Sequence, residues 1–210
     1  MIIQILVDNP NSWLIPYAKK LNKNLIQFGH ESSLIFKHDQ VKKGDILCLL
    51  ACEKIFEKLD LNKHNLVVHE SDLPEGKGWS PLTWQILEGK NKIPVTLFEA
   101  EAELDAGTIY GQKIIELAGT ELLPEIKHKQ GLATLDLILD FVEKFPNNKG
   151  KDQEGESSFY PKRTPKDSEL DPFKTIADQF ELMRVCDNER YPAYFNFRNK
   201  KYTIKIFEND

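Results

Sequence analysis

The sequence predicts an α/β fold with a mainly parallel sheet that is flanked by helices. Two observations support this prediction. Short apolar runs that are typical of buried strands recur along the N-terminal part of the chain, at residues 1–7, 33–36, 45–50 and 65–68. Segments with a helical spacing of apolar residues lie between such runs, and strands that alternate with helices form βαβ units and parallel sheets.

The remaining elements of the core follow from local start and stop signals. Ser12 is the expected N-cap of a first helix that ends at Gly29, with Pro16 in its first turn. Ser80 is the expected cap of a short helix, with Pro81 at the first helical position. Two further strands and a long amphipathic helix are predicted over residues 95–98, 108–117 and 121–145. No GxGxxG motif follows the first strand, so the usual dinucleotide site is not expected.

The composition changes near residue 150. Residues 149–158 are polar and contain glycine, which is typical of a surface loop. Residues 159–171 mix aromatic, basic and proline residues without periodicity, and an ordered loop of this kind usually binds something. A helix over residues 172–183 and a terminal β-hairpin are expected next, the hairpin with strands over 191–197 and 202–207. We therefore divide the chain into a core, residues 1–150, and an extension, residues 151–210.

Charge and composition exclude several classes of protein. The net charge of −5 and the lack of a Lys/Arg-rich block argue against a nucleic-acid surface. We expect neither a signal peptide nor a membrane span, because no apolar run approaches the required length. Three cysteines in 210 residues do not form a disulfide framework, so a reducing cytoplasm is the expected compartment.

Two polar residues follow predicted strands in positions that suit catalysis. His69 comes directly after the run at 65–68, and Asp105 follows the run at 95–98. Ligands of open parallel sheets bind beyond the carboxyl ends of the strands, so the two side chains are expected to converge there. Imidazole is well suited to accept a proton near neutral pH, and a carboxylate would support it. Taken singly, His69 would more often be a hydrogen-bonded structural histidine, and Asp105 a turn residue; the matched loop and the spacing of the two residues favour catalysis.

The order of motifs around these residues resembles the 10-formyltetrahydrofolate-dependent formyltransferase family. The resemblance rests on His69-x-Ser71-x-Leu73-Pro74, then Gly78 and Pro81, then Leu104-Asp105-x-Gly107. It implies a Rossmann-like core, N10-formyltetrahydrofolate as formyl donor, His69 as base and Asp105 as its partner, with no metal. It also implies that the folate donor lies against Ser71, Leu73, Pro74 and Ala106.

One position departs from the family pattern. The family has Asn two residues before the histidine, and this chain has Val67 there. An aliphatic side chain cannot donate a hydrogen bond to a developing oxyanion. Asn65 projects to the same face one pleat deeper, roughly 6–7 Å back, and is expected to be structural.

The extension resembles nucleotide-sugar N-formyltransferases. RTPxDSxLD spans Arg163–Asp171, and RVxDxxxYPAYF spans Arg184–Phe195. The likeness is greatest to enzymes of pseudaminic-acid-type pathways, which implies a UDP-linked 4-amino-4,6-dideoxy sugar as acceptor, and a homodimer. Guanidinium groups suit the diphosphate, whereas the aromatic rings could stack on uracil or pack in the core. The implied acceptor-binding residues are Lys77, Trp79, Tyr160, Lys162, Arg163 and Arg184.

The expected function is formyl transfer from N10-formyltetrahydrofolate to the amine of this UDP-amino sugar. Two alternatives stay open. The first is a catalytically silent nucleotide-sugar-binding module, which the replacement of the family Asn by Val67 supports. The second is a purine-pathway glycinamide ribonucleotide formyltransferase. The RTPxDS and YPAYF tail is not part of the purine-pathway pattern. Since the chain ends after the hairpin, the extra β-barrel domain of methionyl-tRNA formyltransferases is not expected.

Overall fold

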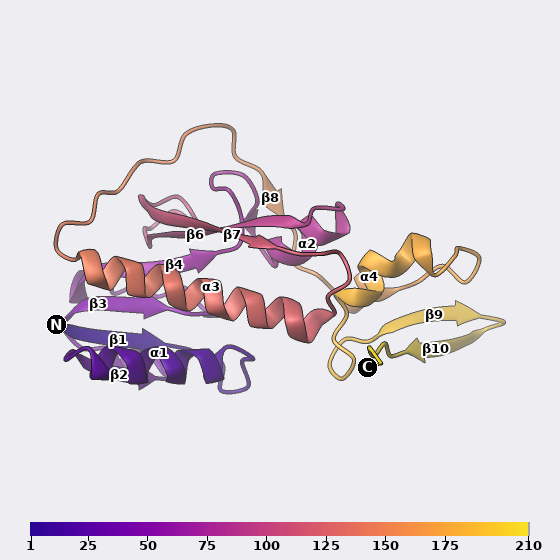
Figure 1. Ribbon diagram of the computed structural model, residues 1–210, viewed down its shortest axis with the longest axis horizontal. Coiled ribbons are helices and arrows are strands. Elements are labelled where there is room, and N and C mark those ends of the chain that lie inside the picture. The colour runs from indigo at the N-terminus through magenta and orange to yellow at the C-terminus, as the bar shows by residue number, and fades with distance from the viewer. Residues whose placement is uncertain (210) are drawn as a thin grey trace.

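The central sheet of the computed structural model, which describes residues 1–209, has six strands in the order β2-β1-β3-β4-β6-β7. Strands β1 to β4 run parallel to one another, whereas β6 runs antiparallel to both of its neighbours, β4 and β7. This confirms the predicted mainly parallel α/β sheet (Figure 1). The strands span Ile2–Leu6 (β1), Glu31–Ile35 (β2), Gly44–Leu49 (β3), Asn62–His69 (β4), Lys92–Glu99 (β6) and Ile109–Glu116 (β7).

Strand β3 shows why its sequence is apolar throughout. Ile46 and Cys48 pack into the large core cluster under the helices, whereas Leu47 and Leu49 pack with Phe56 on the opposite side. Alternate residues of a strand point to opposite faces, so a strand covered on both faces is apolar at every position. The predicted parallel core follows directly from this pattern.

Helices α1 (Ile15–Gln27) and α3 (Leu123–Lys144) lie against the same face of the sheet (Figure 1). Gly131 permits their close contact, because a Cβ at this position would lie 2.5 Å from the ring of Tyr17. The short helix α2 (Pro81–Leu87) begins at proline as predicted. Ser80 does not cap it: this residue has φ 50° and its side chain makes no cap hydrogen bond, so that expectation was wrong.

The predicted helix over 172–183 is also wrong. Only α4 (Phe180–Arg184) is α-helical, and turns and a short 3₁₀ segment precede it. The Asp171 carboxylate accepts the N–H of Phe173, and the Thr175 hydroxyl oxygen accepts the N–H of Asp178. Such local side-chain bonds compete with helical hydrogen bonds.

The terminal β-hairpin forms, but its second strand starts earlier than predicted. It consists of β9 (Ala193–Phe197) and β10 (Lys200–Ile204). Arg198 and Asn199 form the turn with φ values of 49° and 60°. Two positive φ values in sequence are the geometry of a two-residue hairpin turn, so pairing resumes at Lys200.

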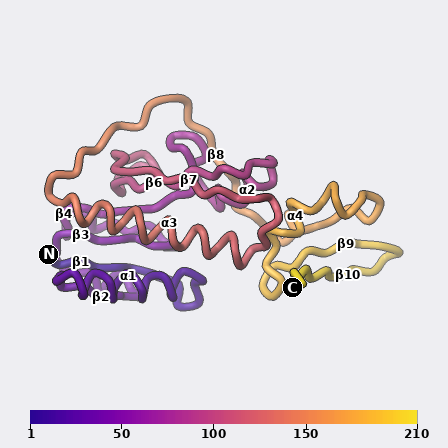
Figure 2. The backbone as a smooth tube through the Cα atoms, in the orientation of Figure 1, coloured from indigo at the N-terminus to yellow at the C-terminus, as the bar shows by residue number. Residues whose placement is uncertain are grey.

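Helix α4 and the strands β9 and β10 of the C-terminal extension lie beyond the end of the sheet toward which β1, β3 and β4 point (Figures 1 and 2). It has a small apolar cluster of its own, formed by Leu170, Met183, Cys186 and Ala193. A long segment returns from the end of α3 to β8 (Phe159–Tyr160), which pairs with β5 (Lys77–Gly78). The domain boundary at residue 150 stays a prediction. No helix within residues 1–209 has the length and apolar character needed to cross a membrane.

Candidate active site

His69 is the last residue of β4 and is only 7% exposed. Its Nε2 is 2.9 Å from the carbonyl oxygen of Gly76. A carbonyl can only accept, so Nε2 carries the hydrogen and donates it. The neutral ring therefore has its lone pair on Nδ1, which is the nitrogen that can act as a base.

Asp105 lies in the turn between β6 and β7, 9% exposed, with φ 51°. Its Oδ2 accepts the N–H of Gly78 at 3.0 Å and lies 4.0 Å from Nε2 of His69. The two residues that the sequence singled out thus lie together at the end of the sheet. The imidazole donates to Gly76 and not to Asp105, so in this arrangement the carboxylate acts on the ring through its charge.

The turn that carries Asp105 depends on two further residues. A Cβ at Gly107 would lie 1.9 Å from the carbonyl oxygen of Glu99, so this position requires glycine. Gln153 donates from its side-chain amide to the carbonyls of both Asp105 and Gly107, at 2.9 Å each. Sequence reasoning missed Gln153, because its polar surroundings indicated only a surface loop.

The residues implied for the folate donor have different surroundings. Leu73 packs with Phe98 and Ile109, so only its backbone is available to a ligand. Ser71 is 2% exposed, and its hydroxyl has no hydrogen-bond partner within residues 1–209. Pro74 is buried, and Ala106 is half-buried.

A hollow of about 480 Å³ lies against the same loop. Ser71 and Gly76 form part of its wall, and residues of α2, β6 and β8 and of the segments beside them supply the rest, including Gln85, Pro94 and Tyr160. The carbonyl of Gly76, a residue of this wall, accepts the His69 hydrogen bond, so the hollow adjoins the loop that holds the imidazole. Its size is within the range of small-molecule sites.

Four of the residues implied for the acceptor gather on the β5–β8 pair. Trp79 donates its backbone N–H to the carbonyl of Tyr160 at 3.1 Å, and Nζ of Lys162 lies 4.4 Å from the centre of the Trp79 ring. Lys77 is 4% exposed, and its Nζ lies 4.0 Å from a carboxylate oxygen of Glu103. The pair adjoins Asp105, because Gly78 of β5 donates the hydrogen bond described above.

Tyr160 is held in place on this pair. Its ring stacks on that of Trp84 at 6.3 Å, and its hydroxyl donates to Glu88 at 2.9 Å. Burial raises the pKa of Tyr160, and the negative Glu88 raises it further. The phenol therefore stays neutral and serves as a fixed donor.

Arg163 lies at the start of a tight turn. Its Nη2 donates to the carbonyl of Asp167 at 2.8 Å, and its buried Nε has no hydrogen-bond partner within the described part of the chain. The hydrogen bond to Asp167 uses only Nη2, so the other donors of the guanidinium do not take part in it. The binding of a diphosphate by Arg163 stays a prediction.

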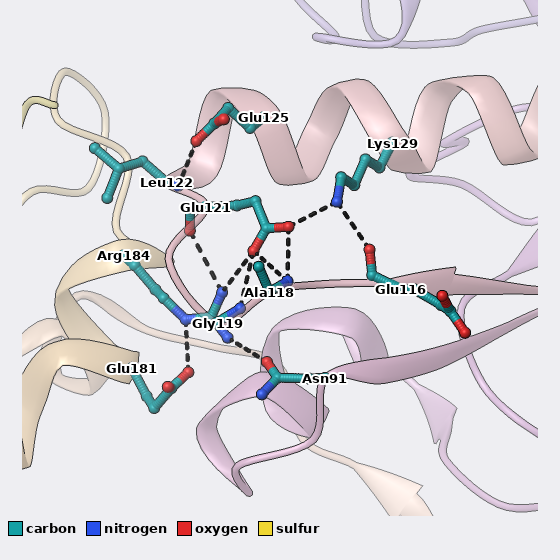
Figure 3. Close-up of polar contacts among 10 residues, drawn as sticks. All are labelled: Asn91, Glu116, Ala118, Gly119, Glu121, Leu122, Glu125, Lys129, Glu181 and Arg184. Carbon is teal, nitrogen blue, oxygen red and sulfur yellow. Dashed lines mark hydrogen bonds and ion pairs between the residues drawn. The ribbon is translucent and has the colours of Figure 1, made fainter. Parts of the chain in front are cut away.

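Arg184 is not a ligand-binding residue, and that prediction is corrected here. It is 0% exposed and donates to Glu181 at 2.6 Å, to Oδ1 of Asn91 at 3.0 Å and to the carbonyl of Glu121 at 3.4 Å (Figure 3). The guanidinium joins α4 to the segments before β6 and α3. A diphosphate in solution cannot reach it.

Asn65 and Val67 have structural surroundings. Asn65 is 4% exposed and donates its amide to the carbonyl of Leu59 at 2.8 Å. Val67 packs against the clusters that contain Leu49 and Leu73. No group of three His, Cys, Asp or Glu side chains in residues 1–209 is arranged to hold a metal ion.

Comparison with known proteins identifies the fold. No protein-family model matches the chain. Methionyl-tRNA formyltransferase of Sulfurihydrogenibium sp. (strain YO3AOP1) is 31% identical over 170 residues, which cover 76% of this chain and 53% of the relative. The match thus spans about half of that curated relative.

Solved structures with this fold include proteins with different names. HypX from Aquifex aeolicus in complex with tetrahydrofolic acid superposes with a TM-score of 0.82 at 18% identity, over 97% of this chain and 37% of HypX. A 4-N formyltransferase from Francisella tularensis superposes with a TM-score of 0.74 at 15% identity, over 100% of this chain and 98% of that one. The chain has the fold that these proteins share.

Proposed function

We propose that this chain transfers a formyl group from N10-formyltetrahydrofolate to the primary amine of a UDP-linked amino-dideoxy sugar. The proposed acceptor is of the pseudaminic-acid type, UDP-4-amino-4,6-dideoxy-N-acetyl-altrosamine. The observation that carries the proposal is the 4.0 Å approach of His69 and Asp105 at the end of the sheet, in a chain with the fold of formyltransferases.

The residues present suit a folate formyl donor. When bound, N10-formyltetrahydrofolate supplies the formyl carbon as an electrophile. Ser71 offers a buried hydroxyl without a partner within residues 1–209, beside a hollow of about 480 Å³. Because Val67 cannot donate, Ser71 is the side chain best placed to hydrogen-bond an oxygen of the donor. The backbone at Leu73, Pro74 and Ala106 would line the remainder.

His69 would remove the proton that the amine must lose. Its Nε2–H is held by Gly76, so Nδ1 accepts the proton. The charge of Asp105 at 4.0 Å stabilises the imidazolium, by about 4 kcal/mol at an effective dielectric constant near 20. General base help of this kind contributes on the order of 10²- to 10⁴-fold in rate.

The β5–β8 pair would hold the acceptor. Lys162 and Arg163 would supply positive charge for the diphosphate. The implied contact of Lys77 is not retained, because its side chain is only 4% exposed. Trp79 is 44% exposed and presents a ring on which a uracil can stack. A nucleotide bound in this way would lie beside Asp105, and its sugar amine would approach His69.

Methionyl-tRNA is the second candidate acceptor. The relative from Sulfurihydrogenibium carries that name, and the same donor and base would serve. A net charge of −5 is unfavourable for binding a polyanion, because phosphate contacts dominate the affinity for nucleic acids. We therefore place the amino sugar first.

The proposed enzyme forms a homodimer through its extension. Phe173, Ile176, Phe197 and Tyr202 are 86%, 73%, 38% and 44% exposed. A second copy would cover such side chains, since large apolar residues gathered at a surface mark interaction sites. Light scattering tests this: a dimer is expected, and a monomer at micromolar concentration contradicts it.

Mass spectrometry tests the proposed reaction. The protein is incubated with N10-formyltetrahydrofolate and, separately, with UDP-4-amino-4,6-dideoxy-N-acetyl-altrosamine, related UDP-4-amino sugars and methionyl-tRNA. A formylated UDP-amino sugar is the expected product. Formylation of methionyl-tRNA alone would identify the second candidate. UDP-sugar binding without product from any acceptor would indicate the silent binding module.

A further inference from the structure

Glu70 is a carboxylate beside the proposed base that the mechanism above does not use. It follows His69 directly at the end of β4 and is half-buried. Its Oε1 accepts from the side-chain amide of Gln130 on α3 at 2.6 Å. Its backbone carbonyl accepts from the amide of Gln85 on α2, also at 2.6 Å. Two helices therefore fix this residue in place.

The charge of Glu70 has no cationic partner within residues 1–209. No Lys, Arg or His nitrogen of that part of the chain lies within 4.0 Å of its carboxylate, and Gln130 is a neutral donor to one oxygen only. Burial raises the pKa of Glu70, a positive His69 and the Gln130 bond lower it, and the charge of Asp105 raises it. A poorly solvated carboxylate without a cation is unfavourable and is typical of sites that receive one.

The position of Glu70 relative to His69 follows from the strand. Consecutive residues of a strand point to opposite faces, so the two side chains flank the end of β4. This end faces the side where ligands of parallel sheets bind. A small group that lies across the strand end can contact both side chains.

We propose that Glu70 binds the acceptor amine in its ammonium form and presents it to His69. This inference rests on the proposed function and extends it to recognition of the reacting group. A primary alkyl amine is mostly protonated at neutral pH. The Glu70 carboxylate accepts hydrogen bonds from the ammonium, one N–H bond then breaks as the proton passes to Nδ1 of His69, and Glu70 remains ionised. The neutral amine that results is the nucleophile.

A comparison of two ligands tests this inference by calorimetry. The first ligand is UDP-4-amino-4,6-dideoxy-N-acetyl-altrosamine, and the second is its N-formylated counterpart, in which the amine is a neutral amide. The wild-type chain is expected to prefer the amine by about 10-fold or more, as for a charged hydrogen bond. The isosteric Glu70→Gln should lose this preference, raise KM for the sugar by a similar factor and leave KM for the folate donor unchanged.

Two further variants separate charge from folding. Gln130→Lys places a cation beside the unaltered Glu70 and should abolish the preference in the same way. Glu143→Gln removes an exposed charge from α3 and should retain it. Because UDP alone lacks the amine, its affinity should be equal in all four proteins.

The outcomes distinguish this inference from the proposed function. Formyl product from the wild type, with an equal ligand preference in wild type and Glu70→Gln, overturns the inference alone. Absence of formyl product from the wild type removes the proposed function, and this inference falls with it. Loss of the preference in both Glu70→Gln and Gln130→Lys, with Glu143→Gln unaffected, supports it.

Discussion

The buried position of Arg184 gives a prediction that separates structure from ligand binding. Arg184→Met keeps most of the apolar stem but removes the guanidinium that bonds Glu181, Asn91 and Glu121. The Arg184 side chain is 0% exposed, but Asn91 is exposed and the Glu181 side chain is 38% exposed, so water can replace the guanidinium at these two residues. The Glu121 carbonyl loses its buried donor, and an unsatisfied buried polar group costs about 1–3 kcal/mol. For a chain of this size that corresponds to a loss of roughly 5 °C in Tm.

Urea unfolding of wild type and variant measures the free energy of unfolding, and calorimetry with UDP at low temperature measures binding by the folded variant. We expect a loss of about 1–3 kcal/mol in the free energy of unfolding and an unchanged affinity for UDP. Arg190→Met removes an exposed guanidinium from the same extension and should be within about 0.5 kcal/mol of wild type. Unchanged stability of Arg184→Met together with lost UDP binding would refute the structural assignment.

Two further predictions concern the turn at Asp105 and the response to acid. Gly107→Ala would place a Cβ 1.9 Å from the carbonyl of Glu99 and should reduce formyl transfer by on the order of 10²-fold, as a displaced catalytic group does. Gly111→Ala, whose Cβ would meet its nearest neighbour at 3.4 Å, is the control, and equal rates would contradict the reasoning. Burial raises the pKa of Glu121, but hydrogen bonds from Lys129 and backbone N–H groups outweigh it and lower that pKa to about 2. The stability that comes from this depressed pKa is present above pH 4.5 and is lost as the pH falls toward 2. Between these pH values, Glu121→Gln should therefore lose less unfolding free energy than the wild type. Urea unfolding measures both losses, and equal losses would contradict the prediction.

The sequence was informative wherever the signal is local. Apolar runs separated by helical spacing located the parallel strands, and Pro81 marked the start of α2. The approach of His69 and Asp105 was expected because both follow strands and the carboxyl ends of parallel strands meet at one edge. That premise fails for Asp105, because β6 runs antiparallel to β4 and ends beside Leu66. It is the turn after β6 that returns Asp105 to His69.

Features that depend on distant pairing could not be predicted. The basic residue Arg184 looked like a phosphate ligand, and only the packing of α4 reveals its buried acceptors. Gln153 lies in a polar run, yet the crossing segment brings its amide to the Asp105 turn. The pairing of β5 with β8 joins residues that precede α3 in the sequence to residues that follow it. The local sequence around Lys77 or Tyr160 contains no signal that predicts this pairing.

The most direct test of the account is the rate of formyl transfer by His69→Asn. Its kcat/KM with N10-formyltetrahydrofolate and the UDP-amino sugar should fall by about 10²- to 10⁴-fold, because the amine would lose its base. Calorimetry should show that the variant still binds UDP, since the β5–β8 pair is unaltered. A variant that turns over at the wild-type rate would contradict the assignment of the chemistry to this imidazole.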